Sequence, residues 1–399
     1  MQVCGIISEY NPFHFGHAAL IQQARKAGAT HVAAIMTGNY VQRGEPALLS
    51  KWARTKQALS CGVDLVVELP LPWAVAGAEK FALGGVALAD ALGVDWLGFG
   101  SECGDVQALT KAANALLDPG LQAEIRRELQ EGITYARARM NAVESLFGTK
   151  TACLLNEPNN ILGIEYIKAL NQLNAKAIPF TIRRVGAAHD EQNSDSPIAS
   201  ASKIRNTVLS KGNYCELLPP SSAEILKEEI EAGRAPVSLL CMERAILAKL
   251  RTMEKSEYAS LPDLSEGLEN RLFQAVKNAS TLEEVFLLTK SKRYTHARIR
   301  RIVLSAFLGV TSGMNQGTPP YLRVLGMNNR GTEILRRAKN VKKLPIISHS
   351  SDILLLDNRA KNVIELENRA TDLYALCMPE SAPCGLDRTT GIIIASPSF

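Results

Sequence analysis

The sequence predicts an α/β fold in which a doubly wound parallel sheet is followed by a mostly helical, basic region. Three observations favour this fold. Short apolar runs alternate with longer amphipathic segments over residues 1–210, helical spacing replaces that alternation afterwards, and basic residues concentrate between residues 290 and 343. Strands that alternate with helices indicate βαβ units and a parallel sheet with helices on both faces. We therefore expect a first domain at residues 1–212 and a second, mainly helical region at residues 213–399.

Five apolar runs of the first domain have the length and composition of buried parallel strands. The expected strands are Val3–Ser8, His31–Met36, Val63–Glu68, Asp95–Gly100 and Ala177–Arg183. Helices are expected at 17–27, 50–60, 77–91, 105–117, 121–145 and 161–173. Ligands of such sheets bind beyond the carboxyl ends of the strands, so we expect the functional loops directly after strands.

The second region shows mainly helical patterns, which cover residues 222–290 and a basic amphipathic segment at 293–309. Two further helices are expected at 331–338 and 350–378. Weaker strand patterns are found at Tyr321–Met327, Leu344–Ile347 and Ile392–Ala395.

The composition is typical of an ordinary globular protein. Of the 399 residues, 46% are hydrophobic and 21% are charged, and no apolar run approaches the length of a membrane span. The N-terminus lacks the basic segment of a signal peptide, so we expect a cytoplasmic protein with no membrane partner. The eight cysteines form no CxxC pair and have no histidine at zinc-finger spacing, so no metal-ligating residues are nominated.

The net charge of +5 is unevenly distributed along the chain. Residues 290–343 hold 13 basic residues and one acidic residue, Glu333, whereas residues 1–210 are neutral overall. A basic block of this kind is typical of a surface that binds a polyanion, with nucleic acid the leading candidate.

The strongest local motif follows the first expected strand. His14 and His17 are three residues apart at a helix start, so both imidazoles share one face. Gly16 lets the backbone approach a ligand, and the helix N-terminus offers N–H groups to phosphate. The motif therefore predicts a nucleoside triphosphate site that needs no Walker loop. A second anion cradle is expected where Ser202 and Lys203 open a later helix.

Together, His-x-Gly-His and the Ser-Lys motif resemble the nucleotidyltransferase and class I aminoacyl-tRNA synthetase superfamily, which has a Rossmann-type fold. Longer blocks make the resemblance closer. Residues 9–17, 42–46, 50–54, 99–102, 158–163 and 291–301 look like those of the bacterial tRNA(Met) cytidine acetate ligase family. The resemblance implies that ATP and acetate form acetyl-adenylate and pyrophosphate. The acetyl group then passes to the wobble cytidine of elongator tRNA(Met), which gives N4-acetylcytidine.

The resemblance also implies which residues bind ATP. The expected contacts are Ile7, Ser8, Glu9, Tyr10, Asn11, Pro12, Phe13, His14, Phe15, Gly16, His17, Ala18, Ala19, Leu20, Gly100, Asn159 and Arg184, with Ser202 and Lys203 from the second cradle. Within Asn159-Asn160 and Arg183-Arg184, either member could be the contact, and we favour Asn159 and Arg184. We assign His14, His17 and Lys51 to stabilising charge on the phosphates during catalysis. ATP chemistry favours Mg²⁺ as a further cofactor, although no carboxylate cluster identifies its ligands.

The basic block is where we expect the tRNA to bind, through phosphate contacts that make binding salt-dependent. The expected tRNA contacts are Lys292, Arg293, Tyr294, Arg298, Arg300, Arg301, Arg336 and Arg337. Tyr294 could stack on a splayed anticodon base or simply pack within a helix.

Two alternatives remain open on the sequence. A small-molecule nucleotidyltransferase would explain residues 1–210 but would leave the basic block unused. A non-catalytic RNA-binding protein would explain the basic block but would not require an intact His-x-Gly-His motif. Acetate selectivity, a general base and oligomeric state are not predicted.

Overall fold

The computed structural model describes residues 1–184, 199–265, 267–291 and 294–395. Five strands form the parallel part of the sheet: β1 (Val3–Ser8), β2 (His31–Thr37), β5 (Leu65–Leu69), β6 (Trp96–Ser101) and β7 (Ile178–Arg183). Their order is β5-β2-β1-β6-β7, with β1 pairing in parallel with both β2 and β6. The sequence-based prediction of a doubly wound parallel sheet is confirmed, and each expected strand lies within about two residues of its observed bounds.

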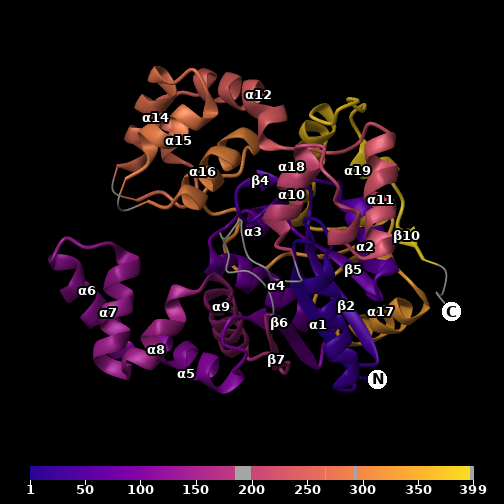
Figure 1. Cartoon of the computed structure of the whole chain (residues 1–399), viewed down its shortest axis with the longest axis horizontal. Coiled ribbons are helices and arrows are strands. Elements are labelled where there is room, and N and C mark those ends of the chain that lie inside the picture. The colour runs from indigo at the N-terminus through magenta and orange to yellow at the C-terminus, as the bar shows by residue number, and fades with distance from the viewer. Residues whose placement is uncertain (185–198, 266, 292–293, 396–399) are drawn as a thin grey trace.

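Side chains alternate between the two faces of this sheet because successive residues of a strand point in opposite directions. On one face, Cys4 and Ile6 of β1 pack against α1 (Phe15–Lys26) and α2 (Lys51–Ser60). On the other face, Val3 and Ile7 join the core formed with α4 (Ala78–Leu92) and α9 (Pro158–Gln172). Helices therefore cover both faces and leave the strand ends as the open edges (Figure 1).

The sheet extends beyond the expected first domain. Strand β8 (Leu322–Met327) pairs with β5 in antiparallel orientation, and β9 (Ile346–Ile347) and β10 (Ile393–Ile394) pair with β8. The expected boundary at residue 212 therefore needs correction, because residues beyond it return to complete the sheet. Apolar residues of β8 enter the core beside β5, so these weak strand patterns are integral to the first domain.

Two helical groups project from the sheet. One contains α5 (Val106–Leu117), α6 (Pro119–Gln130), α7 (Tyr135–Phe147), α8 (Thr149–Cys153) and the 3₁₀ turn η1 (Leu154–Asn156). The single helix expected at 121–145 is wrong, since the chain turns at Gly132, where φ is +72°. A left-handed residue of this kind ends a helix, and glycine adopts it without a steric penalty.

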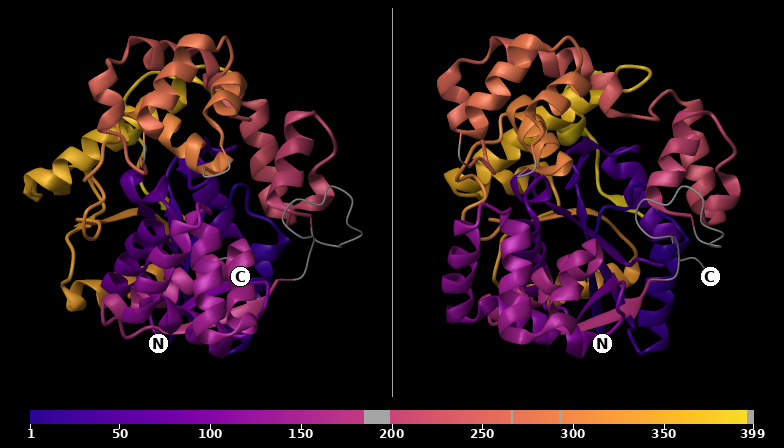
Figure 2. Two further views of the ribbon diagram at one scale, coloured as in Figure 1. Left: turned by 90° about the vertical axis from the view of Figure 1, so that its left-hand side faces the viewer. Right: turned by 60° about the vertical axis from the view of Figure 1, so that its left-hand side comes forward.

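The other group is a helical bundle with its own core. Its helices are α12 (Leu239–Thr252), α13 (Lys255–Ala259), α14 (Leu268–Asn278), α15 (Leu282–Thr289) and α16 (His296–Leu308). Leu366 and Tyr374 of α18 (Asn358–Leu376) also enter this core. Both views in Figure 2 place the bundle beyond one end of the sheet, with α18 between the two.

The remaining elements connect these parts. They are the short hairpin β3 (Tyr40–Val41) and β4 (Glu45–Pro46), α3 (Leu71–Ala74), α10 (Ala201–Leu209), η2 (Cys215–Leu217), α11 (Pro220–Glu231), α17 (Asn329–Val341), η3 (Ser350–Leu355) and α19 (Leu386–Thr389). The β3–β4 hairpin was not expected from the sequence. Within the described residues, no helix is both long enough and apolar enough to span a membrane.

Candidate active site

The loop between β1 and α1 presents two histidines in one fixed arrangement. The Nδ1 atom of His14 accepts a hydrogen bond from Gly16 N at 3.0 Å, and Nδ1 of His17 accepts from His14 N at 3.2 Å. The two rings stack with centroids 3.8 Å apart. Because each Nδ1 is an acceptor, each neutral imidazole carries its proton on Nε2. The loop therefore offers two Nε2–H donors, which match phosphate oxygens.

Both histidines are held in the neutral form. Burial, and then the positive charges of Arg184 and Arg205, lower the pKa of His14 to about 3. Burial and the neighbouring His14 lower the pKa of His17 well below its ordinary value of 6.5. A neutral imidazole cannot supply a net positive charge, so it serves as a hydrogen-bond donor whose protonation does not change near neutral pH.

Buried side chains from two helices hold this loop in place. Gln57 of α2 accepts a hydrogen bond from Phe13 N at 3.4 Å, and Ser222 of α11 donates to Phe13 O at 2.8 Å. The fully buried Arg54 donates to the carbonyl oxygens of Glu9 and Gly38. Arg54 thus ties the loop after β1 to the loop after β2, which gives the site a rigid base.

Arginines from separate loops converge beside the histidines. Arg205 on α10 donates to Asn11 O at 3.0 Å and to Ser202 Oγ at 3.3 Å, and Arg43 of the β3–β4 hairpin donates to the same hydroxyl at 3.4 Å. Arg184, which follows β7, is close enough to lower the pKa of both His14 and His17. Guanidinium groups gathered at the carboxyl edge of a parallel sheet suit a bound polyphosphate.

The N-terminus of α9 is closed by a carboxylate. Glu102 accepts hydrogen bonds from the backbone N–H groups of Asn159 and Asn160 and from Asn159 Nδ2, at 2.6 to 3.1 Å. Asn160 is buried, and its Oδ1 accepts from Cys103 N. Asn160 is therefore enclosed, whereas Asn159 is half-buried beside Glu102, and an ATP contact at Asn159 stays a prediction.

Gly100 on β6 lies directly beneath Arg184. A Cβ atom at this position would stand 3.1 Å from Arg184 Cγ, so a side chain here would displace the arginine. The neighbouring Arg183 is the last residue of β7, and its Cβ lies against Gly104. This placement favours Arg184 over Arg183 as the residue that faces the histidines.

The expected ATP contacts fall into two groups. The side chains of Ile7, Tyr10, Phe13 and Leu20 belong to the hydrophobic core, so only their backbone can meet a ligand. The remaining residues of the loop and of the first turns of α1 differ in burial. Ser8, Asn11, Pro12 and His14 are buried, Phe15 is exposed, and the other five are half-buried: Glu9, Gly16, His17, Ala18 and Ala19. Lys203 is exposed on α10, next to the clustered Ser202.

The structure contradicts the expected catalytic role of Lys51. Its ammonium group is buried, donates to both carboxylate oxygens of Glu68 at 2.8 Å, and lies 2.6 Å from Asp387 Oδ1. Arg323 pairs with these two carboxylates and with Glu367. We call these five residues the buried charge cluster; its three carboxylates share two cations. Enclosed in this way, Lys51 stabilises the fold and does not face a nucleotide.

Glu367 gives the buried charge cluster a pH dependence. Burial, and then the negative charge of Glu68, raise the pKa of Glu367 from its ordinary value of 4.5 to about 7. Between pH 4.5 and about 7 the Glu367 side chain keeps a proton in the folded protein that it releases in the unfolded chain. The contribution of Glu367 to the free energy of unfolding therefore falls as pH rises.

We expect Glu367→Gln to remove this pH dependence. Urea unfolding from pH 4.5 to 7.5 should show the variant gaining stability relative to the wild type as pH rises.

Glu365→Gln is the matched control, because Glu365 is exposed on the same helix, where it pairs with Arg388. Its stability difference from the wild type should stay constant over the same range. Parallel stability curves for Glu367→Gln and the wild type would contradict the prediction.

Several of the expected tRNA contacts on α16, or just before it, already have partners within the protein. Arg298 donates to the Asp263 carbonyl and to Ser265 Oγ, and Arg301 pairs with the Asp263 carboxylate at 3.1 Å. Tyr294 is buried, and its hydroxyl donates to the Ser265 carbonyl at 3.1 Å. Of the two alternatives left open for Tyr294, the structure therefore favours packing within the bundle over stacking on a base. Lys292 and Arg293 lie outside the described residues.

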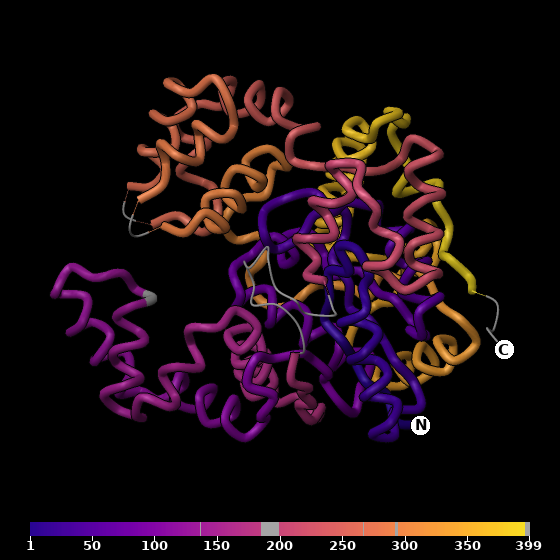
Figure 3. The backbone as a smooth tube through the Cα atoms, viewed as in Figure 1, coloured from indigo at the N-terminus to yellow at the C-terminus, as the bar shows by residue number. Residues whose placement is uncertain are grey.

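Arg336 and Arg337 lie at the other edge of the sheet. Helix α17 follows β8, whose antiparallel direction delivers the chain to the amino ends of the parallel strands. Arg337 makes a bidentate pair with Asp95, directly before β6, and Glu333 contacts His31 at the start of β2. Figures 1 and 3 show α17 beside the N-terminus, away from α16. The basic block is therefore two separate surfaces, which corrects the expectation of one.

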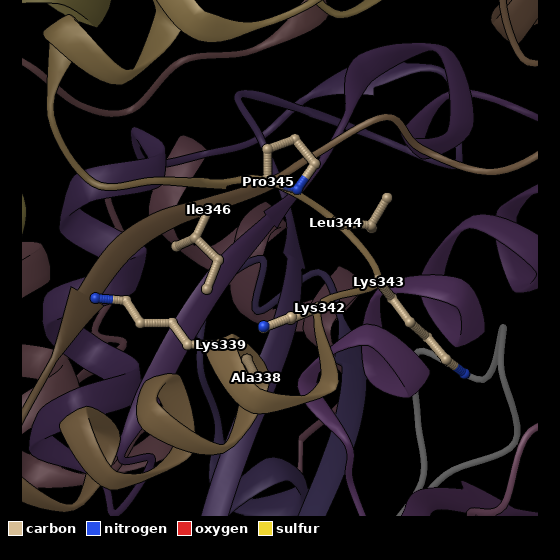
Figure 4. Close-up of a pocket in the computed structure, with 7 residues that line it drawn as sticks. All are labelled: Ala338, Lys339, Lys342, Lys343, Leu344, Pro345 and Ile346. Atoms are coloured by element: carbon tan, nitrogen blue, oxygen red, sulfur yellow. The ribbon is translucent and has the colours of Figure 1, made fainter.

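A hollow of about 430 Å³ opens at the end of α17 and is lined by Ala338, Lys339, Lys342, Lys343, Leu344, Pro345 and Ile346. Figure 4 shows the side chains of Lys339 and Lys343 pointing away from each other, and Lys343 pairs with Asp90. These amino groups do not converge on one ligand.

Arg43 and Arg205 were not expected as site residues from the sequence, although Arg43 stands in the 42–46 block and Arg205 lies close to the Ser-Lys motif. The signal that could have identified them is their place after strands: Arg43 comes soon after β2, and Arg205 follows the Ser-Lys motif by two residues. Spacing alone did not reveal that both reach the hydroxyl of Ser202.

Comparisons with known proteins agree with this geometry. A family model described as HIGH Nucleotidyl Transferase matches residues 1–387. The tRNA(Met) cytidine acetate ligase of Acetivibrio thermocellus is 38% identical over 99% of this chain and 100% of its own length. That of Alkaliphilus metalliredigens is 39% identical over 96% of each chain.

The chain belongs to the tRNA(Met) cytidine acetate ligase family.

Solved structures of the family have the same fold. Thermotoga maritima TmcAL in its apo form is 33% identical to this chain and matches it with a TM-score of 0.95, and each chain is fully covered. The same protein bound to alpha-thio ATP matches with a TM-score of 0.93. The family resemblance inferred from the sequence motifs is thereby confirmed.

Proposed function

We propose that this chain activates acetate with ATP and transfers the acetyl group to the wobble cytidine of elongator tRNA(Met). In the first step an acetate oxygen attacks the α-phosphorus of ATP, which forms acetyl-adenylate and releases pyrophosphate. In the second step the exocyclic amine of cytidine attacks the acyl carbon. AMP leaves, the amine loses a proton, and the product is N4-acetylcytidine. A tRNA substrate would place the reaction in the cytoplasm.

The observation that carries this proposal is the pair of neutral histidines surrounded by arginines. Negative charge builds on the phosphate oxygens as pyrophosphate leaves, and donors that are already oriented stabilise this charge without reorganising. The Nε2–H groups of His14 and His17 are such donors, because their Nδ1 atoms are occupied by backbone N–H groups. Arg184 and Arg205 add positive charge at the same edge of the sheet. This arrangement suits phosphate chemistry better than proton transfer, and no general base is assigned.

A tRNA substrate is supported by the charge of α16 and by its position. The bundle lies beyond the end of the sheet that carries the histidines, and the relatives are named for action on tRNA(Met). The target base must leave its stack to reach an adenylate in the sheet edge. Within the described residues, the pair that Arg300 makes with Glu45 is long, at 4.0 Å, so Arg300 is the expected phosphate contact on this helix.

Mg²⁺ remains a prediction that follows from ATP chemistry. The described part of the chain has no group of three or more His, Cys, Asp or Glu residues that could hold a metal ion. Two carboxylates that follow strands β1 and β6 also have other partners: Glu9 accepts from Gln42 N at 2.8 Å, and Glu102 closes α9. We therefore name no ligand for Mg²⁺ among the described residues and assign no step to the ion.

The proposed function is tested by ATP–pyrophosphate exchange in the absence of tRNA. We expect exchange that requires acetate, followed by transfer of radiolabelled acetate to elongator tRNA(Met) and not to initiator tRNA(Met). Exchange that ignores acetate would favour a different adenylyl acceptor, as in a small-molecule nucleotidyltransferase. Tight tRNA binding with no exchange under any condition would favour a non-catalytic RNA-binding protein.

A further inference from the structure

Helix α16 rests directly on the β3–β4 hairpin beside the candidate active site. Gly44 in this hairpin has φ of +76°, and a Cβ atom there would lie 2.5 Å from Arg301 N and 2.6 Å from the Arg300 carbonyl carbon. Both atoms belong to the helix backbone and cannot move aside. Only glycine therefore permits this contact, which joins the bundle to the sheet without intervening side chains.

The residue after Gly44 connects the two sides electrostatically. Oε1 of Glu45 lies 3.2 Å from Arg205 Nη2, and its Oε2 lies 4.0 Å from Arg300 Nη1. The Glu45 side chain is 19% exposed, so solvent screens these pairs only in part. One carboxylate is thus shared between an arginine of the candidate active site and an arginine of α16.

Arg205 carries this connection into the loop that bears the histidines. Its guanidinium donates to Asn11 O and to Ser202 Oγ, and its pKa is lowered by burial, with Glu45 opposing that shift. Within the described residues, Glu45 Oε1 and Arg300 Nε are buried atoms that make no hydrogen bond of good geometry. Arg205 is thus held by partners other than Glu45, whereas the 4.0 Å approach of Glu45 to Arg300 is the looser of the two pairs.

We propose that Glu45 is a positioning residue that couples α16 to the ATP site by holding Arg205 in place and sharing its charge with Arg300. This inference rests on the proposed function, because it assumes that Arg205 faces ATP and that α16 faces tRNA. A tRNA phosphate that contacts Arg300 competes with the Glu45 carboxylate for this arginine. The interaction of Glu45 with Arg205 changes as a result. Occupancy of α16 by tRNA therefore alters the affinity for ATP, and ATP alters the affinity for tRNA by the same factor.

Two possible roles of Glu45, positioning Arg205 and lowering the local positive charge, predict opposite changes in the KM for ATP in Glu45→Gln. Removal of a negative charge near a polyphosphate site would by itself lower the KM for ATP. If Glu45 positions Arg205, the variant instead raises the KM for ATP by about tenfold in acetate-dependent exchange without tRNA, while kcat changes little. Glu45→Asp, which keeps the charge, should recover part of this loss. A lowered KM in Glu45→Gln would overturn the inference.

A double-mutant cycle tests the sharing with Arg300. Because Arg300→Gln leaves Glu45 to Arg205 alone, we expect it to change the KM for ATP even without tRNA, and to have no further effect in the Glu45→Gln background. The matched control is Arg244→Gln, an exposed arginine on the neighbouring α12, which should leave the KM unchanged. Additive effects of Glu45→Gln and Arg300→Gln would show that the two residues act separately, and would contradict the proposal.

Failure of the proposed function is distinguishable from failure of this inference. If the wild type shows no acetate-dependent exchange, the proposed function is wrong. Calorimetric titration with a non-hydrolysable ATP analogue then measures the same double-mutant cycle as binding constants. Non-additive constants would still support the coupling through Glu45, and additive constants would overturn it.

Discussion

His17→Ala should lose acetate-dependent ATP–pyrophosphate exchange by at least about a hundredfold, which is the usual cost of removing one donor that stabilises transition-state charge. The hydrogen bond that His17 Nδ1 accepts from His14 N fixes the direction of its Nε2–H, and alanine offers no donor at this position. The loss should fall mainly on kcat, because the charge on the leaving pyrophosphate is greatest in the transition state. Steady-state kinetics with saturating acetate and varied ATP measure it.

The matched control is His31→Ala, which removes another buried histidine from the same sheet. His31 begins β2 at the amino edge, where its Nε2 lies 3.2 Å from Glu333. It should therefore cost stability without a comparable loss of exchange. The affinity of His17→Ala for tRNA should match that of the wild type. Loss of tRNA binding with exchange intact would mean that the histidines serve the RNA and not the nucleotide.

The sheet and the histidine pair were predictable because both depend on local patterns. Buried strands show as apolar runs, and two histidines three residues apart at a helix start share a face wherever the helix lies. The tautomers of His14 and His17 were not predictable, since they depend on which backbone N–H meets each Nδ1. Only the folded loop supplies that information.

Other expectations failed because they depend on contacts between distant segments. The basic residues of 290–343 are close in sequence, yet β8 runs antiparallel to β5 and sends α17 to the opposite edge from α16. Charge counted along a chain cannot reveal such a reversal. In the same way, the motif around Lys51 did not indicate its partner, because Asp387 arrives from the far C-terminal part of the chain.

Lys51→Met should destabilise the protein by about 3–5 kcal/mol, the usual cost of leaving buried charge without its partner. The variant would leave the carboxylates of Glu68, Glu367 and Asp387 with Arg323 as the single remaining cation of the buried charge cluster. Urea unfolding followed by circular dichroism measures the change. Lys56→Met is the matched control, because Lys56 is exposed on the same helix and its loss should change stability by no more than about 0.5 kcal/mol.

A second substitution separates charge balance from packing. Glu68→Gln removes one carboxylate, so Lys51→Met with Glu68→Gln restores the excess of one carboxylate over cations that the wild type has. We expect the double variant to be less destabilised than the sum of the single variants. At a temperature where Lys51→Met is fully folded, the exchange rate per molecule of this variant should stay within about threefold of the wild type. The reason is that the Lys51 ammonium of the wild type does not face the nucleotide. A hundredfold loss in the folded variant would return Lys51 to the catalytic role that its motif suggested, and would require the ammonium to leave Glu68 when ATP binds.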